Sequence, residues 1–434
     1  MRCTPRLLTL ALIIYSAGCE VRDSRTVVTT VVDPPPATLI AAAAPQEQAG
    51  SGESAPAKTS EPLKPLTDAE LAEGWIALFD GQSLFGWKAH SKAVWSIKEG
   101  AVGVSEGEKG LLCTTVPFDN YVLKAEFRAA KGTNSGIFLR TAPVVGMDDI
   151  KTKCYELNIA PPDNPFPTGS FVQRQKGKEV PERAGEWQTF EVTLDGPKST
   201  VKLNGEEVLT YDDPAPSGRG LIGLQLNTGA VEFKNIKLKP LGLLPLFNGK
   251  DLAGWKDHPE SKSKFTVNEK GELHVTSTGR GCIESDKQFG DFVLQLECIS
   301  HAPSLNSGLF FRCIPGEFMN GYESQIHNGY KNGDRSQPVD TGTGGIFKRV
   351  NARVVNANDK EWFTQTIIAA GPHILVWVNG YQVTDWTDDR KADKNPRNGL
   401  RVEPGTLQIQ GHDPATDLSF RNLKARELAK SDSE

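Results

Sequence analysis

Two stretches of this chain repeat one pattern: Ala77-Leu-Phe-Asp-Gly-Gln-Ser-Leu-Phe-Gly-Trp87 and Pro245-Leu-Phe-Asn-Gly-Lys-Asp-Leu-Ala-Gly-Trp255. The same further motifs follow each stretch in the same order. They are Asn-Ser-Gly-(Ile/Leu)-Phe-x-Arg, Tyr-Glu, Glu-Trp, Asn-Gly and Phe-(Lys/Arg)-Asn-(Ile/Leu). The repeat distance of about 170 to 190 residues is far longer than a solenoid repeat and matches a whole domain. We therefore predict two diverged copies of one domain, at residues 67–241 and 242–428.

Alternation of apolar and polar side chains identifies the strands. Residues 122–128 and 292–298 both alternate with a period of two, which indicates strands with one buried face. Asn204-Gly205 and Asn379-Gly380 each separate two strand-forming segments, a strong hairpin signal. Neither copy contains a long stretch with helical periodicity. The prediction is an all-β fold in which each copy is a two-sheet jelly-roll sandwich.

Composition and cysteine spacing exclude several function classes. The 434 residues carry 49 Lys and Arg against 54 Asp and Glu, a net charge of −5, so we expect no nucleic-acid partner. None of the seven cysteines has the C-x-x-C spacing of a structural zinc site. Five of them lie beyond the leader, so at least one is unpaired. Cys298 and Cys313 either form a disulfide or are buried thiols.

The first residues resemble an export signal. Arg2 and Arg6 precede a short apolar run, and Ser-Ala-Gly then leads to Cys19, an ending similar to a bacterial lipobox. We expect residues 1–18 to be a lipoprotein signal peptide and Cys19 to be acylated. The lipid would anchor the protein to the membrane on the periplasmic or cell-surface side; the alternative is ordinary cleavage and free secretion. Residues 19–66 are rich in Pro, Ala and Ser and are expected to be a disordered linker, and 429–434 a short tail.

The ordered set of motifs resembles the 3-keto-disaccharide hydrolase family, also described as 3-keto-glucoside-1,2-lyase/3-keto-2-hydroxy-glucal hydratase domains. The resemblance covers both copies. It implies a concanavalin A-like jelly roll that acts on glycosides already oxidised to a ketone at C3. It also suggests, as a partner, the glycoside 3-dehydrogenase that makes the ketone.

The two copies differ at the residues suited to chemistry. In the second copy, Glu323, Gln325 and His327 alternate along one strand and so share a face. Further on, Gln410-Gly-His412 matches the family's Gln-x-His. The first copy has Ala160 and Asn227 at the positions of the two histidines, and Lys348 aligns with Val172.

We therefore predict that the second copy is catalytic. His327 and His412 are the expected base and acid, because imidazole titrates near neutral pH. Lys348 and Arg312 are expected to stabilise an enolate, and Glu323 to orient a histidine. A divalent cation held by Glu323 and His327 stays open. The remaining substrate-binding candidates are Tyr322, Gln325, Asn306, Gln410 and again Arg312.

Two other functions are weighed against this one. A retaining or inverting glycosidase needs two carboxylates at a set separation, and the Glu323 strand shows only one. A surface lipoprotein that binds oligosaccharide without turnover is the stronger alternative. Trp87, Trp255, Trp362 and Trp377 are then candidate sugar platforms, although tryptophans are more often part of the core.

Overall fold

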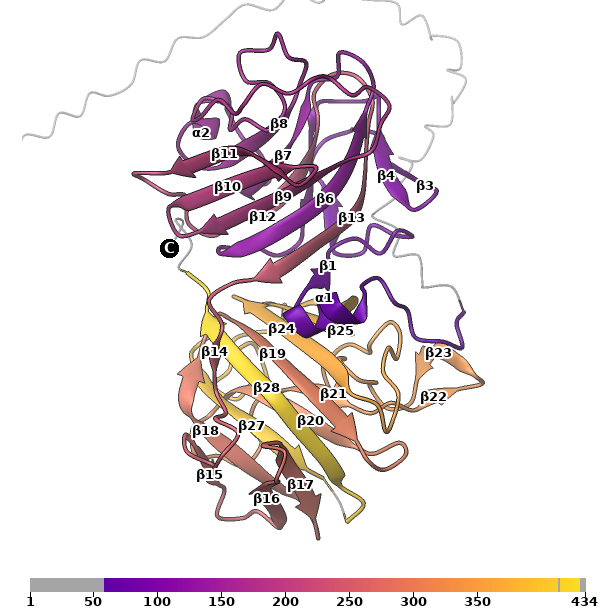
Figure 1. Ribbon diagram of the computed structural model, residues 1–434. Coiled ribbons are helices and arrows are strands. Elements are labelled where there is room, and N and C mark those ends of the chain that lie inside the picture. Colours follow the sequence, from indigo (N-terminus) through magenta and orange to yellow (C-terminus); the bar gives the residue numbers. More distant parts are fainter. Residues whose placement is uncertain (1–57, 413, 430–434) are drawn as a thin grey trace, which may run out of the picture. The chain divides into compact units, whose positions relative to one another are not determined.

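The computed structural model describes residues 58–412 and 414–429. The predicted signal peptide, Cys19, most of the predicted linker and nearly all of the tail lie outside these residues. Figure 1 shows the described chain mostly as strands, coloured from indigo at the start of the first copy to yellow at the end of the second. Within the described residues, no helix is long and apolar enough to cross a membrane.

The first copy begins with a short helix and continues almost entirely as strands. Its elements are α1 (Asp68–Glu73), β1 (Ile76–Ala77), β2 (Trp87–Ala89), β3 (Ser96–Lys98), β4 (Ala101–Val104), β5 (Gly110–Thr114), β6 (Tyr121–Ala129), β7 (Ser135–Thr141), α2 (Met147–Ile150), β8 (Tyr155–Ile159), β9 (Gln188–Asp195), β10 (Lys198–Leu203), β11 (Glu206–Asp212), β12 (Leu221–Leu226) and β13 (Val231–Pro240).

The second copy repeats this order of strands and adds one hairpin. Its elements are β14 (Leu244–Pro245), β15 (Trp255–Asp257), β16 (Ser263–Val267), β17 (Leu273–Ser277), β18 (Gly281–Phe289), β19 (Phe292–Ser300), β20 (Ser307–Cys313), β21 (Tyr322–Ile326), the added hairpin β22 (Tyr330–Lys331) and β23 (Asp334–Pro338), β24 (Phe363–Ala370), β25 (His373–Val378), β26 (Tyr381–Thr387), β27 (Gly405–Gly411) and β28 (Asp417–Glu427).

Both copies fold as antiparallel two-sheet sandwiches, so the predicted all-β jelly-roll class is confirmed. The first has an eight-stranded sheet in the order β11-β10-β9-β6-β13-β4-β3, with β1 beside β13, and a five-stranded sheet β2-β5-β12-β7-β8. The second has β26-β25-β24-β19-β28-β17-β16, with β14 beside β28, and β15-β18-β27-β20-β21. Strand for strand the two orders of these sheets are the same, so each of their strands in one sandwich has a structural counterpart in the other.

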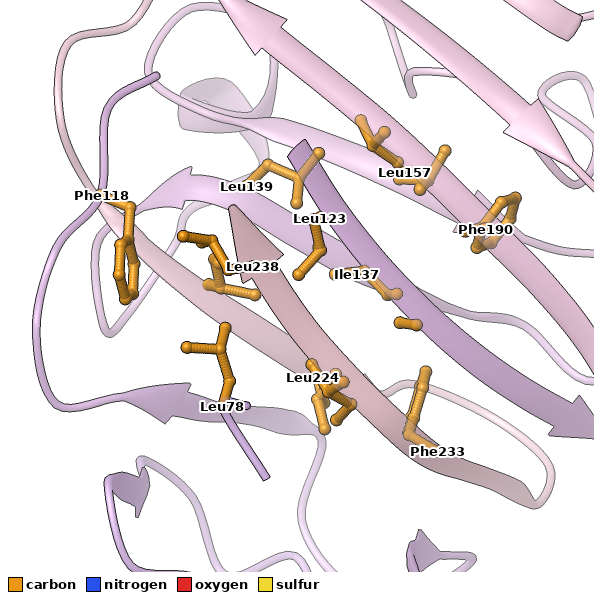
Figure 2. Packing of buried hydrophobic residues seen from close by; sticks show 14 of the residues in the cluster. Leu78, Phe118, Leu123, Ile137, Leu139, Leu157, Phe190, Leu224, Phe233 and Leu238 are labelled. Carbon is orange, nitrogen blue, oxygen red and sulfur yellow. The ribbon is translucent and has the colours of Figure 1, made fainter. Parts of the chain in front are cut away.

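The alternation and the Asn-Gly turn predicted from the sequence both recur in the structure of the first sandwich. In β6 the residues Leu123, Ala125 and Phe127 are buried and alternate with partly exposed ones. Leu123 of one sheet packs with Ile137 and Leu224 of the other in the core (Figure 2). Both residues of the Asn204-Gly205 turn have positive φ, 53° and 87°, as the predicted tight hairpin requires.

The structure answers the question left open for two cysteines and adds contacts at β19 and at residues 58–66 that the sequence did not predict. Cys298 and Cys313 are free buried thiols, which settles the alternative against a disulfide between them. The outward face of β19 is also covered, because Gln295 Nε2 donates a hydrogen bond to the carbonyl of Gly74 at 2.8 Å. Residues 58–66, placed in the linker, are bonded to the second sandwich. Arg335 Nε donates to Ser60 O, and Asn356 exchanges two hydrogen bonds with the backbone of Leu63.

Candidate functional site

The outer face of the five-stranded sheet in the second sandwich gathers polar side chains. On β21 the core takes Tyr322 and Ile326, so Glu323 and Gln325 point to the opposite face. On β27 the core takes Leu407 and Ile409, so Gln408 and Gln410 point the same way as Glu323. Strand alternation thus places a carboxylate and three amides on one surface.

Glu323 is the charged centre of this face. The residue is only 4% exposed, and its carboxylate lies 3.0 Å from the guanidinium of Arg397. Burial raises the pKa of Glu323 above its ordinary value, and the positive charges of Arg397 and His412 oppose that rise. Arg397 also lies over the ring of Phe310, 4.8 Å from its centroid. This carboxylate can therefore accept a proton more readily than an exposed one, while a cation stays beside it.

Amide groups next to Glu323 have unused hydrogen-bonding capacity. Gln325 Nε2 donates to Asn306 Oδ1 at 3.0 Å, and Asn306 Nδ2 donates to Asp340 Oδ2 at 3.1 Å. The Oε1 atoms of Gln325 and Gln410 are buried and have no hydrogen-bond partner among the described residues. Buried acceptors without a partner are rare, and a ligand's hydroxyl groups would satisfy them.

Each candidate histidine directly follows the end of a strand that carries site residues. His412 follows Gln410 by two positions, and its charge acts on Glu323. Its backbone N–H donates to Thr416 Oγ1 at 3.0 Å. His327 follows Gln325 by two positions and is nearly buried. Its Nδ1 accepts from the N–H of Gly329 at 3.1 Å, so the proton of the neutral ring lies on Nε2.

Lys348 lies at the edge of this group. It is exposed, and its Nζ is 5.2 Å from the centroid of the Phe347 ring, which Arg397 also contacts at 5.5 Å. Its alignment with Val172 was wrong by one residue. The N–H of Phe347 bonds to Glu323 O as that of Val172 bonds to Glu156 O, so Lys348 corresponds to Gln173. Both of these residues have positive φ, 58° and 59°.

Arg312 does not belong to the site. Its side chain is fully buried, and its guanidinium donates to the carbonyls of Gly290, Gly371 and Arg401 and to Asp291 Oδ1. These hydrogen bonds all connect Arg312 to loops at one end of the sandwich, and none is made to Glu323. Arg140 makes the equivalent bonds in the first sandwich, including one to Asp119 O at 2.7 Å. The arginine shared by both copies therefore stabilises the fold.

Tyr322 is also a core residue instead of a substrate contact. Its ring stacks on Phe311, with centroids 5.5 Å apart. Its hydroxyl donates to Asp388 Oδ2 at 2.7 Å and accepts from the N–H of Arg401. Because successive side chains of a strand point to opposite faces, Tyr322 faces away from Glu323. The Tyr-Glu motif thus combines one structural residue with one site residue.

The first sandwich has a less polar version of the same face. Its counterpart of Glu323 is Glu156, whose pKa burial raises to about 7, with a hydrogen bond from Gln225 acting against the rise. Around it, Leu111, Cys113 and Phe138 form an apolar cluster with residues of the α2 region. In the second sandwich the strand register puts Glu284 at the position of Cys113.

Comparison of the sequence with models of known families shows to which family the chain belongs. The profile of the 3-keto-α-glucoside-1,2-lyase-like domain matches residues 74–239 and again residues 242–426. The two matches cover most of the chain. The chain belongs to the 3-keto-α-glucoside-1,2-lyase-like family. Each match coincides with one of the two sandwiches.

Parts of the chain are also similar to individual proteins. The chain is 25% identical over 267 residues to a 3-keto-disaccharide hydrolase of Bacteroides thetaiotaomicron, covering 45% of this chain and 92% of that protein. A protein of Parabacteroides distasonis described as a glycosyl hydrolase is 20% identical, with a TM-score of 0.35, covering 43% of this chain and 94% of its own. The carbohydrate-binding module CBM66 of Bacillus subtilis is 14% identical, with a TM-score of 0.31, covering 42% and 99%.

Within this family domain, two residues near Glu323 were not found from the sequence. Arg397 comes from the loop between β26 and β27, and Asp340 from the loop after β23. Their bonds to Glu323 and to Asn306 join segments that are remote in the chain. The Pro396-Arg397-Asn398 sequence is typical of a turn and gave no signal of a charged partner.

The structure also shows the surroundings of the candidate metal ligands and of the four candidate tryptophans. Among the described residues, Glu323 and His327 are not part of any group of three His, Cys, Asp or Glu ligand atoms within 4.8 Å of one another. Trp87, Trp255 and Trp377 are buried and donate their indole N–H groups to backbone carbonyls, so they are core residues. Trp362 is partly exposed, and Arg421 covers its ring at 4.0 Å.

Proposed function

We propose that this chain is a carbohydrate-active enzyme that cleaves glycosides carrying a ketone at C3, and that the second sandwich does the chemistry. Family membership and the name of the Bacteroides relative support the substrate class. The observation that carries the assignment to the second sandwich is the position of Glu323. This buried carboxylate pairs with Arg397 and is subject to the charge of His412, and its sheet also carries two buried amide oxygens without partners among the described residues.

The chemistry follows from the ketone. A ketone at C3 acidifies the hydrogen on C2, so a base can remove that proton and the electron pair moves to O3 as an enolate. The enolate then re-forms its carbonyl, the C1–O bond breaks, and an acid protonates the departing oxygen. Addition of water across the resulting C1–C2 double bond completes a net hydrolysis. The reaction needs a base, an acid and positive charge near O3.

The residues around Glu323 can meet these needs. His412 or His327 serves as base or acid, and Glu323 orients His412 or takes the proton itself. When Glu323 becomes protonated, it no longer neutralises Arg397, whose positive charge can then stabilise the enolate. Lys348 adds a second cation at the edge of the face. Gln325, Asn306 and Gln410 bind hydroxyl groups of the sugar.

The first sandwich lacks part of this set. Asn227 stands where the second has His412, and Ala160 where it has His327. An apolar cluster replaces polar residues beside Glu156. We infer that the first sandwich binds sugar or supports the fold.

Replacement of the histidines tests the assignment. His412→Ala and His327→Ala are made in the full chain and assayed for release of the 3-keto sugar and the aglycone from a 3-keto-glycoside. Loss of a general acid or base is expected to lower kcat by about 10²- to 10⁴-fold. Asn227→Ala, at the His412 position of the first sandwich, is the matched control and should retain full activity. Unchanged rates in both histidine variants, with circular dichroism unchanged, would refute the catalytic role.

A sugar-binding protein without turnover is the second candidate. The observation in its favour is the run of amides on one face, because such groups bind hydroxyls without needing chemistry. This alternative predicts that the chain binds an unoxidised oligosaccharide and a 3-keto-glycoside equally well and releases nothing from either. Calorimetry combined with product analysis on the same samples separates the two functions.

We also propose that the protein is exported and acylated at Cys19, and that a glycoside 3-dehydrogenase supplies its substrate. The lipobox-like ending before Cys19 supports the first point. Metabolic labelling with palmitate in a bacterial host should mark the wild-type chain, and Cys19→Ala should abolish the label. Equal labelling of both would refute acylation at Cys19.

A further inference from the structure

We propose that the second sandwich binds one divalent transition-metal ion through His274, His301 and Asp417, at a site separate from the Glu323 face. One ligand atom from each residue lies within 4.8 Å of the other two. His274 Nε2 is already 2.9 Å from Asp417 Oδ1, and the rings of His274 and His301 meet edge to face at 5.9 Å. The proposal rests on this geometry and does not depend on the proposed function.

Three neighbouring strands of the eight-stranded sheet build this group. Asp417 begins β28, His274 lies on β17, and His301 directly follows the end of β19. β28 lies between the other two strands and pairs with both. The N–H of His301 donates to Asp417 O at 2.9 Å, which fixes the two backbones side by side.

The side chains project outward from the sheet. Leu273 and Val275 are fully buried, so His274 between them faces solvent. Leu418 is also fully buried, which turns Asp417 outward on the same surface as His274. All three ligands are therefore accessible to an ion from solution. Glu323 belongs to the other sheet of the sandwich.

The ligand set suits zinc and its neighbours. Imidazole nitrogens and a carboxylate oxygen bind Zn²⁺ at about 2.0–2.2 Å, which puts tetrahedral ligands about 3.3 Å apart. Because His301 is exposed and His274 is partly exposed, ring rotation can bring the nitrogens to that spacing without moving the strands. Two imidazoles and one carboxylate leave a fourth position for water, and hard cations such as Mg²⁺ prefer all-oxygen sites.

A neighbouring residue already orients one of the ligands. Ser419 Oγ is 3.0 Å from His301 Nε2, a contact of the kind that fixes metal-binding histidines from behind. Nδ1 of His301 is then the nitrogen available to the ion. Ser419 pairs across the sheet with His274, so the same residue lies beside both histidines.

The first sandwich shows that the fold does not require this group. Ala130 N–H bonds to Ala230 O as His301 N–H bonds to Asp417 O, and Gly103 occupies the place of His274. The same three strands thus close with two alanines and a glycine. Three potential ligands at those positions in the second sandwich therefore need another explanation, and metal binding supplies one.

Calorimetry of the full chain, without an affinity tag and after EDTA treatment, tests the site. The probe is Zn²⁺ alone, and one equivalent should bind to the wild type. His274→Gln and His301→Gln should each weaken binding by at least tenfold, and Ser419→Ala by about tenfold, the lower end expected for an outer partner of a ligand. Cu²⁺ should bind more tightly than Zn²⁺, and Mg²⁺ and Ca²⁺ should give no heat.

The matched control is His373→Gln. His373 Nε2 lies 2.5 Å from Asp385 Oδ1, so this is a second His–Asp pair, but it has no third ligand of these types among the described residues. Zinc affinity should be unchanged in this variant. Absence of binding to the wild type, wild-type affinity in His274→Gln or in His301→Gln, or loss of binding in His373→Gln would each overturn the proposal.

Discussion

Glu156→Gln should change how the stability of the first sandwich depends on pH. The Glu156 side chain is 5% exposed, and burial raises its pKa from an ordinary 4.5 to about 7. In the unfolded chain this carboxyl ionises near its ordinary value. Between about pH 4.5 and 7 the folded state therefore binds more protons than the unfolded state. The free energy of unfolding must fall as the pH rises through this interval.

The size of the effect follows from the two pKa values. Each unit of difference between folded and unfolded states corresponds to about 1.4 kcal/mol. Ionisation of Glu156 should thus cost about 3 kcal/mol of stability by pH 8, compared with pH 4. Glutamine has a similar shape and no charge, so Glu156→Gln removes this loss. Relative to wild type, the variant should be more stable at pH 8 than at pH 4 by about 3 kcal/mol.

Urea denaturation at a series of pH values, followed by tryptophan fluorescence and circular dichroism, measures the difference. Comparing variant with wild type cancels the contribution of every other titrating group. Glu206→Gln, at an exposed position on β11 of the same sandwich, is the control and should show no such trend. A stability difference between Glu156→Gln and wild type that stays constant from pH 4 to 8 would refute the reasoning.

Three further predictions concern the second sandwich. Arg312→Met removes four bonds of a buried guanidinium and should lower the free energy of unfolding by about 3 kcal/mol or more, as measured by urea denaturation; a loss below 1 kcal/mol would contradict its structural role. In Gly308→Ala the new methyl would lie 2.7 Å from Glu323 Oε1, so the carboxylate must move, and turnover should fall by about 10²-fold in kinetic assays; full activity would argue against the geometry. Tyr322→Phe loses the hydroxyl bond to Asp388 and should cost about 1.5 kcal/mol in thermal unfolding while turnover is retained; lost turnover in a folded variant would return Tyr322 to the site.

Local patterns in the sequence were sufficient to predict the strands and one face of the site. Alternation along a strand is a local property, and it placed Glu323 and Gln325 together, with Gln410 on a second strand. The Asn-Gly turns were recognisable because both residues must adopt positive φ.

Arg312 shows where alternation fails. The pairing of β20 with β27 shifts between Phe310 and Cys313, and Arg312 has a φ of 50°. A β-bulge of this kind turns a side chain to the other face of the sheet. The neighbouring residues contain no sequence signal that predicts the bulge. Arg312 was therefore assigned to the substrate, although its side chain belongs to the interior.

Arg397 shows a second limit. Its pairing with Glu323 joins residues far apart in the chain, and the loop that carries it has no periodicity to interpret. The partner of a buried charge could be expected in principle, because an isolated buried carboxylate is costly. Which of the many arginines supplies it depends on the tertiary fold.

The rate of 3-keto-glycoside cleavage by two matched variants of the full chain tests the central claim most directly. Glu323→Gln and Glu156→Gln change the same position of the two sandwiches by the same atoms. We expect kcat to fall by about 10²- to 10⁴-fold in Glu323→Gln and to stay at the wild-type value in Glu156→Gln. Full activity of Glu323→Gln, or a larger loss in Glu156→Gln, would contradict the assignment of catalysis to the second sandwich.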